Sequence, residues 1–394
     1  MRILFLTPNF PNPLEPTKGM PDYNTARELA ARHHEVVVIA PISWLNEFRH
    51  RNSGRTITRT RRVDGIEVHH PRYCYPPGTL RTTYGWFLWR SIKPTVIRAL
   101  ERCQPDVVFA GWVHPDGDSA LRIAALARAP SIVWSGGSDV LVLSRHPARR
   151  KYILNVLTRS DAVVCASAHL KKAITNLGVD HRKVRVLHRG VDTNLFLPGD
   201  RSKARRRLGL PLDGAVLLWV GWMVPVKGVD VLIDACAALL AGGLDLRLCL
   251  VGDGPLRRAL LTRAVKAGVE NRVMFVGDVP HDALADWYRA ANLTVLSSHS
   301  EGVPNVLYES ISCGTPFVAS DVGGVSEIAD PGLDRLVPPG NVRALASAIR
   351  DGLFSVSVPT RALVPGSWED NAVAIEAVFE GAIEAKAAAA AGGR

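Results

Sequence analysis

The hydrophobic positions fall into short apolar runs that alternate with segments of helical spacing. Runs of four to seven residues rich in Val, Ile and Leu indicate buried strands. In the first half these are Ile3–Leu6, Val36–Ala40, Ile66–His69, Val107–Ala110, Ile132–Trp134, Ala162–Cys165 and Val184–Leu187. Helical spacing lies between them over Asp22–Arg32, Pro94–Cys103 and Ser119–Arg128. Strands alternating with helices predict an α/β fold with parallel, doubly wound sheets.

The same scheme restarts in the second half of the chain. Its strands are expected at Ala215–Val220, Leu246–Val251, Val273–Val276, Leu293–Leu296 and Phe317–Ser320. The turn-rich connector TNLFLPGDR lies before this restart. We therefore predict two Rossmann-like domains facing a cleft, with boundaries 1–195 and 196–365. Trp368–Ala385 reads as a long helix, and the final AAAAAGGR as a frayed end.

Composition is that of a folded protein of ordinary domain size. The chain has 394 residues, 47% of them hydrophobic, which is enough for two cores. Its longest apolar run, Ala215 to Val226, contains Pro225 and is too short to span a bilayer. A single charge and a short strand before Pro8 argue against a secretory signal. The six cysteines lack metal-ligand spacing, and several lie inside apolar runs. These features favour a cytoplasmic protein with free thiols.

The excess of positive over negative charge lies entirely in the first half. Residues 1–199 carry 29 Lys and Arg against 15 Asp and Glu, and the remainder carries 19 against 22, which together give the net charge of +11. Twelve basic residues lie in Arg49–Arg102, interleaved with aromatic residues such as Trp86 and Trp89. That mixture suits an anionic membrane surface or a phosphate-bearing acceptor. A solvated basic face is the plain alternative. We expect no nucleic-acid partner, because no nucleic-acid motif accompanies the segment.

The most informative stretch is SEGVPNVLYESISCGTPFVASDVGG, from Ser300 to Gly324. It predicts a strand, a polar loop, a helix with Pro304 at its first position, and a further strand. Glu301 and Glu309 bracket the start of that helix. Free N–H groups there can hold a phosphate, while a carboxylate can accept hydrogen bonds from a diol. A diol beside a diphosphate describes a nucleotide sugar.

The run E-G-x-P-N-V-x-x-E followed by C-G-T-P-x-V-A-S-D-V-G-G resembles glycosyltransferase family 4, retaining enzymes of the GT-B fold. Further agreement extends over nearly the whole chain, through HPDG, GSDV, GWMVPVKG, LVGDGPL and PHDALADWYRAANL. The resemblance implies that Glu309 holds the donor ribose and that Glu301 contacts the transferred sugar. The amides of Gly302, Val303, Pro304 and Asn305 would lie near that sugar. In this family the C-terminal helix, here 366–388, packs back onto the first domain.

Other site elements follow strands as well. Lys227 in GWMVPVKG can place a positive charge on a diphosphate. The family usually has a basic residue after Gly221, where this chain has Trp222. Gly19 allows close backbone approach in the loop after the first strand, whose Lys18 is an extra candidate phosphate contact, and Asp22 is expected to cap the next helix. Gly252 follows a strand, and by resemblance Val276 presents backbone groups to the base.

A second departure concerns a histidine beside the transferred sugar. The family often has His-Gly-x-Asp where this chain has Gly136-Gly137-Ser138-Asp139. His114 follows a neighbouring strand and is a candidate catalytic residue, with a structural histidine as the alternative. Asp116 and Asp118 form a D-x-D pattern, but they precede a helix and are expected to cap it. We therefore expect no metal site.

These observations predict a metal-independent, retaining hexosyltransferase that uses a nucleoside-diphosphate sugar as co-substrate and requires no further cofactor. Glu301, Lys227 and His114 are the expected catalytic residues. The expected acceptor is a hydroxyl of a glycan or polyprenyl-linked glycan, in envelope or exopolysaccharide synthesis at the inner membrane face. Two alternatives remain: a non-catalytic partner that binds a nucleotide sugar or glycan, and a sugar-nucleotide epimerase or hydrolase on the same scaffold.

Overall fold

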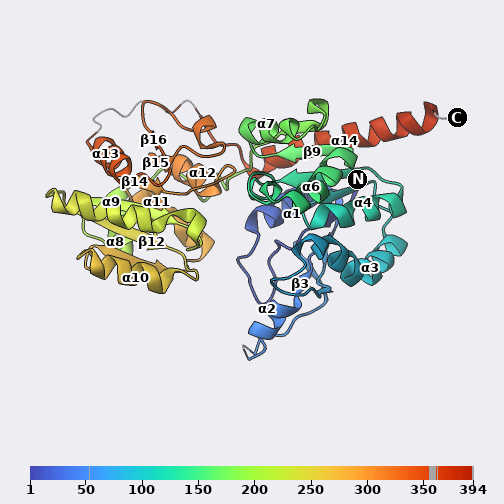
Figure 1. Ribbon diagram of the computed structural model, residues 1–394, viewed down its shortest axis with the longest axis horizontal. Helices are drawn as coiled ribbons and strands as arrows, with labels where there is room; N and C mark the ends of the chain where they lie inside the picture. Colours follow the sequence, from blue (N-terminus) through green and yellow to red (C-terminus); the bar gives the residue numbers. More distant parts are fainter. Residues whose placement is uncertain (53, 355–360, 362, 393–394) are drawn as a thin grey trace. The chain divides into compact units, whose positions relative to one another are not determined.

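The chain folds into two compact units (Figure 1). The computed structural model describes residues 1–52, 54–354, 361 and 363–392. Unit 1 comprises Met1–Gly190 and Trp368–Arg394, and unit 2 comprises Val191–Ser367. The chain thus passes into unit 2 five residues before the predicted boundary at 195/196 and returns to unit 1 at its end.

Unit 1 is built on an eight-stranded sheet in the order β10-β9-β8-β7-β1-β2-β5-β4. All neighbours are parallel except β4 and β5, which are antiparallel. β3 (Ile42–Ser43) and β6 (Arg72–Tyr73) form a separate parallel pair. The sheet strands are β1 Arg2–Leu6, β2 Glu35–Ile39, β4 Thr60–Val63, β5 Ile66–His69, β7 Val107–Ala110, β8 Ser131–Ser135, β9 Ala162–Cys165 and β10 Val184–Val186. Every predicted strand of this half is present. β4, with the sequence TRRV, lacked the apolar run that identified the others.

Unit 1 contains helices between and beside these strands, and one of them, α3, begins well before its predicted start. They are α1 Met20–Ala31, α2 Trp44–Arg49, α3 Tyr84–Arg102, α4 Asp116–Ala127, α5 Ser138–Leu141, α6 Pro147–Arg159 and α7 Ala168–Asn176. The predicted start of α3 at Pro94 was wrong, because Pro94 lies inside the helix. Leu88, Ile92, Val96 and Ala99 form a buried stripe at three- and four-residue spacing. The free energy gained by burying this stripe exceeds the cost of the backbone hydrogen bond that Pro94 removes.

Helix α14 (Trp368–Gly392) follows unit 2 in sequence but packs on α1 in unit 1 (Figure 1). Arg32 pairs with Glu376 at 2.6 Å, and the Asn371 side-chain amide donates to the His188 carbonyl at 2.6 Å. The Phe379 ring contacts that of Phe109 at 5.3 Å between centroids. The prediction of a frayed end was wrong for residues up to Gly392, because α14 continues to that residue. Its alanines are the strongest helix formers.

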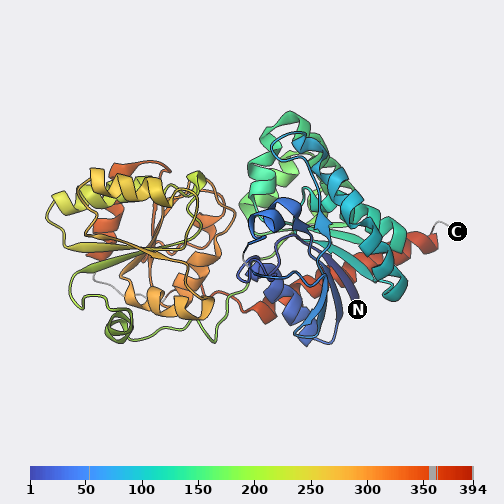
Figure 2. The same cartoon turned by 90° about the horizontal axis from the view of Figure 1, so that it is seen from below.

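Unit 2 contains a six-stranded, wholly parallel sheet in the order β13-β12-β11-β14-β15-β16. Figure 2 shows this sheet between two layers of helices. The strands are β11 Ala215–Val220, β12 Leu246–Val251, β13 Val273–Gly277, β14 Leu293–Leu296, β15 Phe317–Ser320 and β16 Arg335–Val337. The helices are α8 Arg201–Leu208, α9 Val229–Ala241, α10 Arg257–Lys266, α11 Leu284–Ala290, α12 Asn305–Ser312 and α13 Val342–Leu353. Separate apolar clusters fill the two faces of the sheet.

Both units also contain short 3-10 helices. They are η1 Arg81–Thr83, η2 Leu143–Arg145, η3 His181–Lys183, η4 Pro225–Lys227, η5 His281–Ala283 and η6 Val325–Glu327. The cysteines are free thiols, all buried except Cys74. Within the described residues, no helix combines the length and the apolar character needed to cross a membrane.

The strand order of each sheet reverses direction at one point. In unit 2 the reversal falls between β11 and β14, and in unit 1 between β1 and β7. Loops that leave the carboxyl ends of two such strands run to opposite faces of the sheet and open a crevice. Each unit therefore has a ligand-binding edge that its topology alone identifies.

Candidate functional site

The loops after β11 and β14 lie against each other at the reversal point of unit 2. Gly228 has a φ of 57°, and a Cβ there would lie 2.2 Å from the Ser297 carbonyl oxygen. Only glycine permits so close an approach in that conformation. The His299 amide donates to the Val226 carbonyl at 2.8 Å and joins the loops a second time. These contacts bring Lys227 beside Glu301.

Lys227 and Glu301 form an ion pair with 2.7 Å between Nζ and Oε1. The same oxygen accepts a hydrogen bond from the Ser298 hydroxyl at 2.6 Å. The Glu301 side chain is 10% exposed and that of Lys227 is 25% exposed. Both donors act on Oε1, so neither engages the second carboxylate oxygen. The structure thus brings together two of the three expected catalytic residues, although no contact with a substrate tests their roles.

Helix α12 begins directly after this pair. Its N-cap is Pro304, so the predicted helical start was one residue early, and no side chain caps the helix. No side chain therefore occupies the first backbone N–H groups of α12, although that of Leu307 donates to the Pro304 carbonyl at 3.1 Å. The N–H groups of Asn305 and Val306 are the ones that could face an anion. The preceding loop is held by Gly323, where a Cβ would lie 2.0 Å from the Glu301 carbonyl oxygen. Gly302 and Val303 lie in this half-buried loop, and Asn305 is the first residue of the helix.

Glu309 lies in α12 and has two partners that the sequence did not identify. The Tyr288 hydroxyl on α11 donates to Oε2 at 2.7 Å. His281, the first residue of η5, places Nε2 3.6 Å from Oε1. The nearby Glu309 carboxylate raises the pKa of His281 above its usual value. The sequence PHDALADWYRAANL contains both partners, but nothing in its spacing points to Glu309.

The remaining predicted donor residues of unit 2 lie at the ends of β11 to β13. The Gly221 amide donates to the Val251 carbonyl at 3.0 Å, and the Gly252 amide donates to the Gly277 carbonyl at 2.7 Å. Both N–H groups are thus used by the protein itself. Val276 is half-buried in β13. The Trp222 side chain, where a cation was expected, is 56% exposed.

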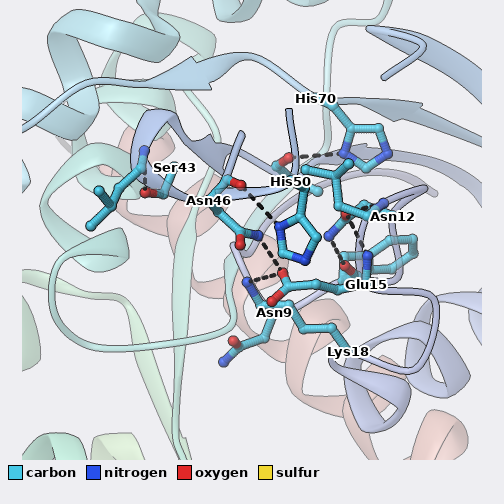
Figure 3. A network of polar contacts seen from close by, with 12 residues as sticks. Asn9, Asn12, Glu15, Lys18, Ser43, Asn46, His50 and His70 are labelled. Carbon is cyan, nitrogen blue, oxygen red and sulfur yellow. Dashed lines mark hydrogen bonds and ion pairs between the residues drawn. The ribbon is translucent and has the colours of Figure 1, made fainter. Parts of the chain in front are cut away.

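In unit 1 the loop after β1 folds into a polar network (Figure 3). The Asn12 side-chain oxygen accepts from the amides of Leu14 and Glu15 at 3.0 and 3.1 Å. Glu15 then pairs with Lys18 at 3.1 Å and accepts from the Asn46 amide at 2.7 Å. The charge of Lys18 is therefore balanced within the loop. Gly19 is the N-cap of α1, in the left-handed region.

Asp22 does not cap α1, so that prediction was wrong. It lies in the first turn, where its buried carboxylate accepts from the Thr7 hydroxyl at 2.7 Å and pairs with Arg189 at 2.9 Å. Burial raises the pKa of Asp22, and Arg189 opposes that rise. The Arg189 guanidinium also stacks over the Trp134 ring at 4.4 Å. Sequence reasoning missed this pair because 167 residues separate its members.

His114 lies after β7, at the ligand edge of unit 1, and is 7% exposed. Burial lowers its pKa, so the ring is neutral near pH 7. Among the described residues, Nε2 has no hydrogen-bond partner. Gly136 follows β8, and a Cβ there would meet only the Trp134 Nε1 atom, at 3.9 Å. A site role for His114 therefore stays a prediction.

Asp116 and Asp118 occupy the first turn of α4, but neither caps it by a side-chain hydrogen bond. The prediction that these two aspartates cap the helix was therefore wrong, although both lie in its first turn. Asp118 pairs with Arg122 at 3.0 Å. Asp116 is fully buried, and burial beside Asp22 and Asp139 raises its pKa well above the usual range. In the part of the chain that the structure describes, no group of three His, Cys, Asp or Glu side chains could hold a metal ion.

Two family profiles match complementary parts of the sequence. Glycosyltransferase Family 4 matches residues 23–195, and Glycosyl transferases group 1 matches residues 214–353. TuaC of Bacillus subtilis, which is assigned to teichuronic acid biosynthesis as a glycosyltransferase, is 29% identical over 89% of this chain and 88% of its own length. The chain belongs to glycosyltransferase family 4. The predicted family and enzyme class, a hexosyltransferase, are confirmed.

Other relatives of this glycosyltransferase match only part of their length. The D-inositol 3-phosphate glycosyltransferase of Acidothermus cellulolyticus is 37% identical over 48% of this chain and 44% of its own length.

Solved structures share the fold of the glycosyltransferase. Sucrose-phosphate synthase of Thermosynechococcus elongatus has a TM-score of 0.79 at 20% identity, covering 98% of this chain and all of that one. Anabaena HepE in complex with UDP-glucose has a TM-score of 0.70 at 22% identity, covering both chains completely. The predicted GT-B fold is thereby confirmed.

The Asp22–Arg189 pair gives a stability prediction for the glycosyltransferase. Arg189→Ala leaves a buried carboxylate without its cation and removes the stacking on Trp134, so we expect a loss of about 3 kcal/mol. Arg2→Ala, which breaks the exposed pair with Asp106, should cost much less. Urea denaturation followed by circular dichroism measures both, in the transition that unfolds unit 1. Equal losses in the two variants would contradict the assignment of Arg189 as a buried structural cation.

Proposed function

We propose that this enzyme is a retaining hexosyltransferase that takes its sugar from a nucleoside diphosphate. The observation that carries the proposal is the Lys227–Glu301 pair beside the uncapped start of α12. A cation, free N–H groups and a carboxylate with an open oxygen suit a diphosphate joined to a sugar.

The proposed donor lies along α12. Glu309, one helical turn beyond the first N–H groups, would accept hydrogen bonds from the ribose diol. Glu301 would accept from a hydroxyl of the transferred sugar, and Lys227 with the α12 amides would bind the diphosphate. The GT-B neighbour HepE, whose structures hold UDP and UDP-glucose, supports a nucleotide-sugar donor.

The proposed reaction needs no protein nucleophile. The bond between the sugar C1 and the diphosphate oxygen breaks while the acceptor oxygen attacks C1 from the same face. The acceptor hydroxyl passes its proton to the departing diphosphate, which carries the electron pair of the broken bond. Lys227 and the N–H groups of α12 would stabilise the negative charge that develops on that leaving group.

The proposed acceptor is a hydroxyl of a lipid-linked glycan, reached at an anionic membrane surface. TuaC, assigned to teichuronic acid biosynthesis, supports an envelope polysaccharide. On α3, Trp86, Arg90 and Lys93 are exposed and fall at i, i+4 and i+7, so they share one face of the helix. An exposed Trp beside two cations is typical of a surface that enters the lipid interface.

The two carboxylates test the donor assignment directly. Glu309→Ala should weaken donor binding about tenfold or more, because a hydrogen bond to a charged group contributes about 1.5–3 kcal/mol. Glu301→Ala should mainly slow transfer. Titration with UDP, ADP, GDP and UDP-glucose, together with product analysis, measures both effects, and Glu270→Ala on the exposed surface of unit 2 is the control. Wild-type affinity and turnover in both variants would reject the site, and sugar release without acceptor would indicate a hydrolase.

Metal independence is also part of the proposal. Asp116 is buried and Asp118 is engaged by Arg122, and we propose neither as a metal ligand. Transfer should therefore continue at an unchanged rate after treatment with EDTA. Loss of turnover that Mn²⁺ or Mg²⁺ restores would refute this prediction.

The exposed face of α3 gives the membrane prediction. Arg90→Gln with Lys93→Gln should reduce co-sedimentation with anionic vesicles at low salt, because each cation near such a surface contributes about 1 kcal/mol. Several hundred millimolar salt should weaken wild-type binding as well. Arg201→Gln with Lys203→Gln removes two exposed cations from α8 and serves as the matched control. Equal binding of wild type to neutral and anionic vesicles would exclude an electrostatic membrane surface.

A further inference from the structure

We infer that Tyr288 and His281 are positioning residues that hold the Glu309 carboxylate ready for the ribose diol. The inference rests on the proposed function, because it assigns the support of the same donor site. Neither residue is expected to touch the donor. Each acts on one oxygen of Glu309, and the two approach from different elements, α11 and η5.

Tyr288 fixes the direction of the carboxylate. Its side chain has no exposed surface, and its hydroxyl lies 2.7 Å from Oε2 of Glu309. Burial next to a carboxylate raises the pKa of this phenol well above its usual value, so it remains a donor. The Phe196 ring packs edge-on against both the Tyr288 ring, at 5.8 Å, and the His281 ring, at 5.2 Å. Packing on this scale leaves the phenol little freedom to turn away.

His281 places a positive charge beside Oε1, the other carboxylate oxygen of Glu309. Its Nε2 lies 3.6 Å from Oε1, within ion-pair range but beyond a direct hydrogen bond of good geometry. The charged groups that act on it are Glu309, Asp192 before α8 and Asp282 within η5, and all three are acidic. They raise the pKa of the imidazole and so favour its protonated form. A cation at this position offsets the negative charge that Glu309 adds beside an anionic donor.

The remaining acceptor capacity of Glu309 matches a diol. A carboxylate has about four lone-pair positions, two on each oxygen. Tyr288 uses one position on Oε2, and His281 faces Oε1. One position on each oxygen therefore stays open, and the side chain is 13% exposed. Two parallel acceptors held at fixed spacing suit hydroxyls on adjacent carbons, such as the 2′- and 3′-hydroxyls of ribose.

The test compares UDP with 2′-deoxy-UDP by calorimetric titration, with the ADP and GDP pairs measured alongside in case the base differs. Wild type should bind the ribonucleotide about tenfold more tightly than the deoxynucleotide, as for one charge-assisted hydrogen bond. In Tyr288→Phe the ratio should fall to about threefold or less, because the carboxylate is no longer held in the binding direction. The kcat at saturating donor should change little.

Matched controls separate positioning from general stability. Tyr73→Phe removes a largely buried phenol hydroxyl that donates to the Tyr84 carbonyl in unit 1. His181→Asn removes an imidazole that lies 3.7 Å from the Asp180 carboxylate, also in unit 1. Both should keep the wild-type ratio of ribonucleotide to deoxynucleotide affinity. A thermal melt of each variant checks that unit 2 remains folded.

The pH dependence tests His281. Because its pKa is raised in the folded protein, the charged pair is complete below pH 6.5 and is lost as pH rises through the raised value. Nucleotide affinity should therefore fall as pH rises from 6.5 through the raised pKa of His281, both in wild type and in His181→Asn. In His281→Asn this step should be absent, and affinity should match the high-pH wild-type value throughout.

The outcomes distinguish the inference from the function on which it rests. If folded wild type binds none of the three ribonucleotides, or prefers none over its deoxy form, the proposed donor site fails and the inference with it. If wild type discriminates but Tyr288→Phe keeps the full ratio, the function stands and the role of Tyr288 is refuted. An unchanged pH step in His281→Asn refutes the role of His281 in the same way.

Discussion

The close approach of two loops at the carboxyl ends of β11 and β14 is the constraint on which the proposed donor site depends. Without a side chain at Gly228, the backbone of one loop reaches the Ser297 carbonyl of the other, and Lys227 then meets Glu301 at 2.7 Å. Any Cβ at that glycine would separate the loops and the two charges together. The site is therefore set by backbone geometry first, and the side chains take positions that the backbone has already fixed.

The strands were predictable because burial on both faces of a parallel sheet demands continuous apolar runs, and short runs such as Leu293–Leu296 between polar segments fit such strands. Lys227, Glu301 and Glu309 could be named because they follow or flank such strands in recognisable strings. Contacts between helices left no such trace. Tyr288 and Glu309 are 21 residues apart on neighbouring helices, and the hydrophobic spacing of neither helix predicts that their side chains are in contact. The wrong start of α3 has the same origin, since a local breaker, Pro94, was outweighed by tertiary burial.

The two units handle buried charge in different ways. In unit 2 the carboxylates at the candidate site have cations beside them, Lys227 for Glu301 and His281 for Glu309. In unit 1 three aspartates, Asp22, Asp116 and Asp139, are buried, and Arg189 pairs with Asp22. Burial without enough positive charge raises the pKa of all three. Burial thus shifts the acids at the ligand edge of unit 1 toward protonation, with a cation beside Asp22, whereas both carboxylates at the candidate site of unit 2 have a cation beside them.

This difference constrains how a diphosphate could be held. Trp222 removes one expected cation from the loop after β11, and Glu301 already offsets the charge of Lys227. The charge of that loop pair is then near zero, which is not enough by itself to bind a dianion. The positive charge that a diphosphate still needs would come from the uncapped start of α12, which is equivalent to about half a positive charge. His281 would offset the negative charge of Glu309. Because N–H groups bind a diphosphate by direction as well as charge, the proposed donor site would depend on the orientation of α12 more than on any one cation.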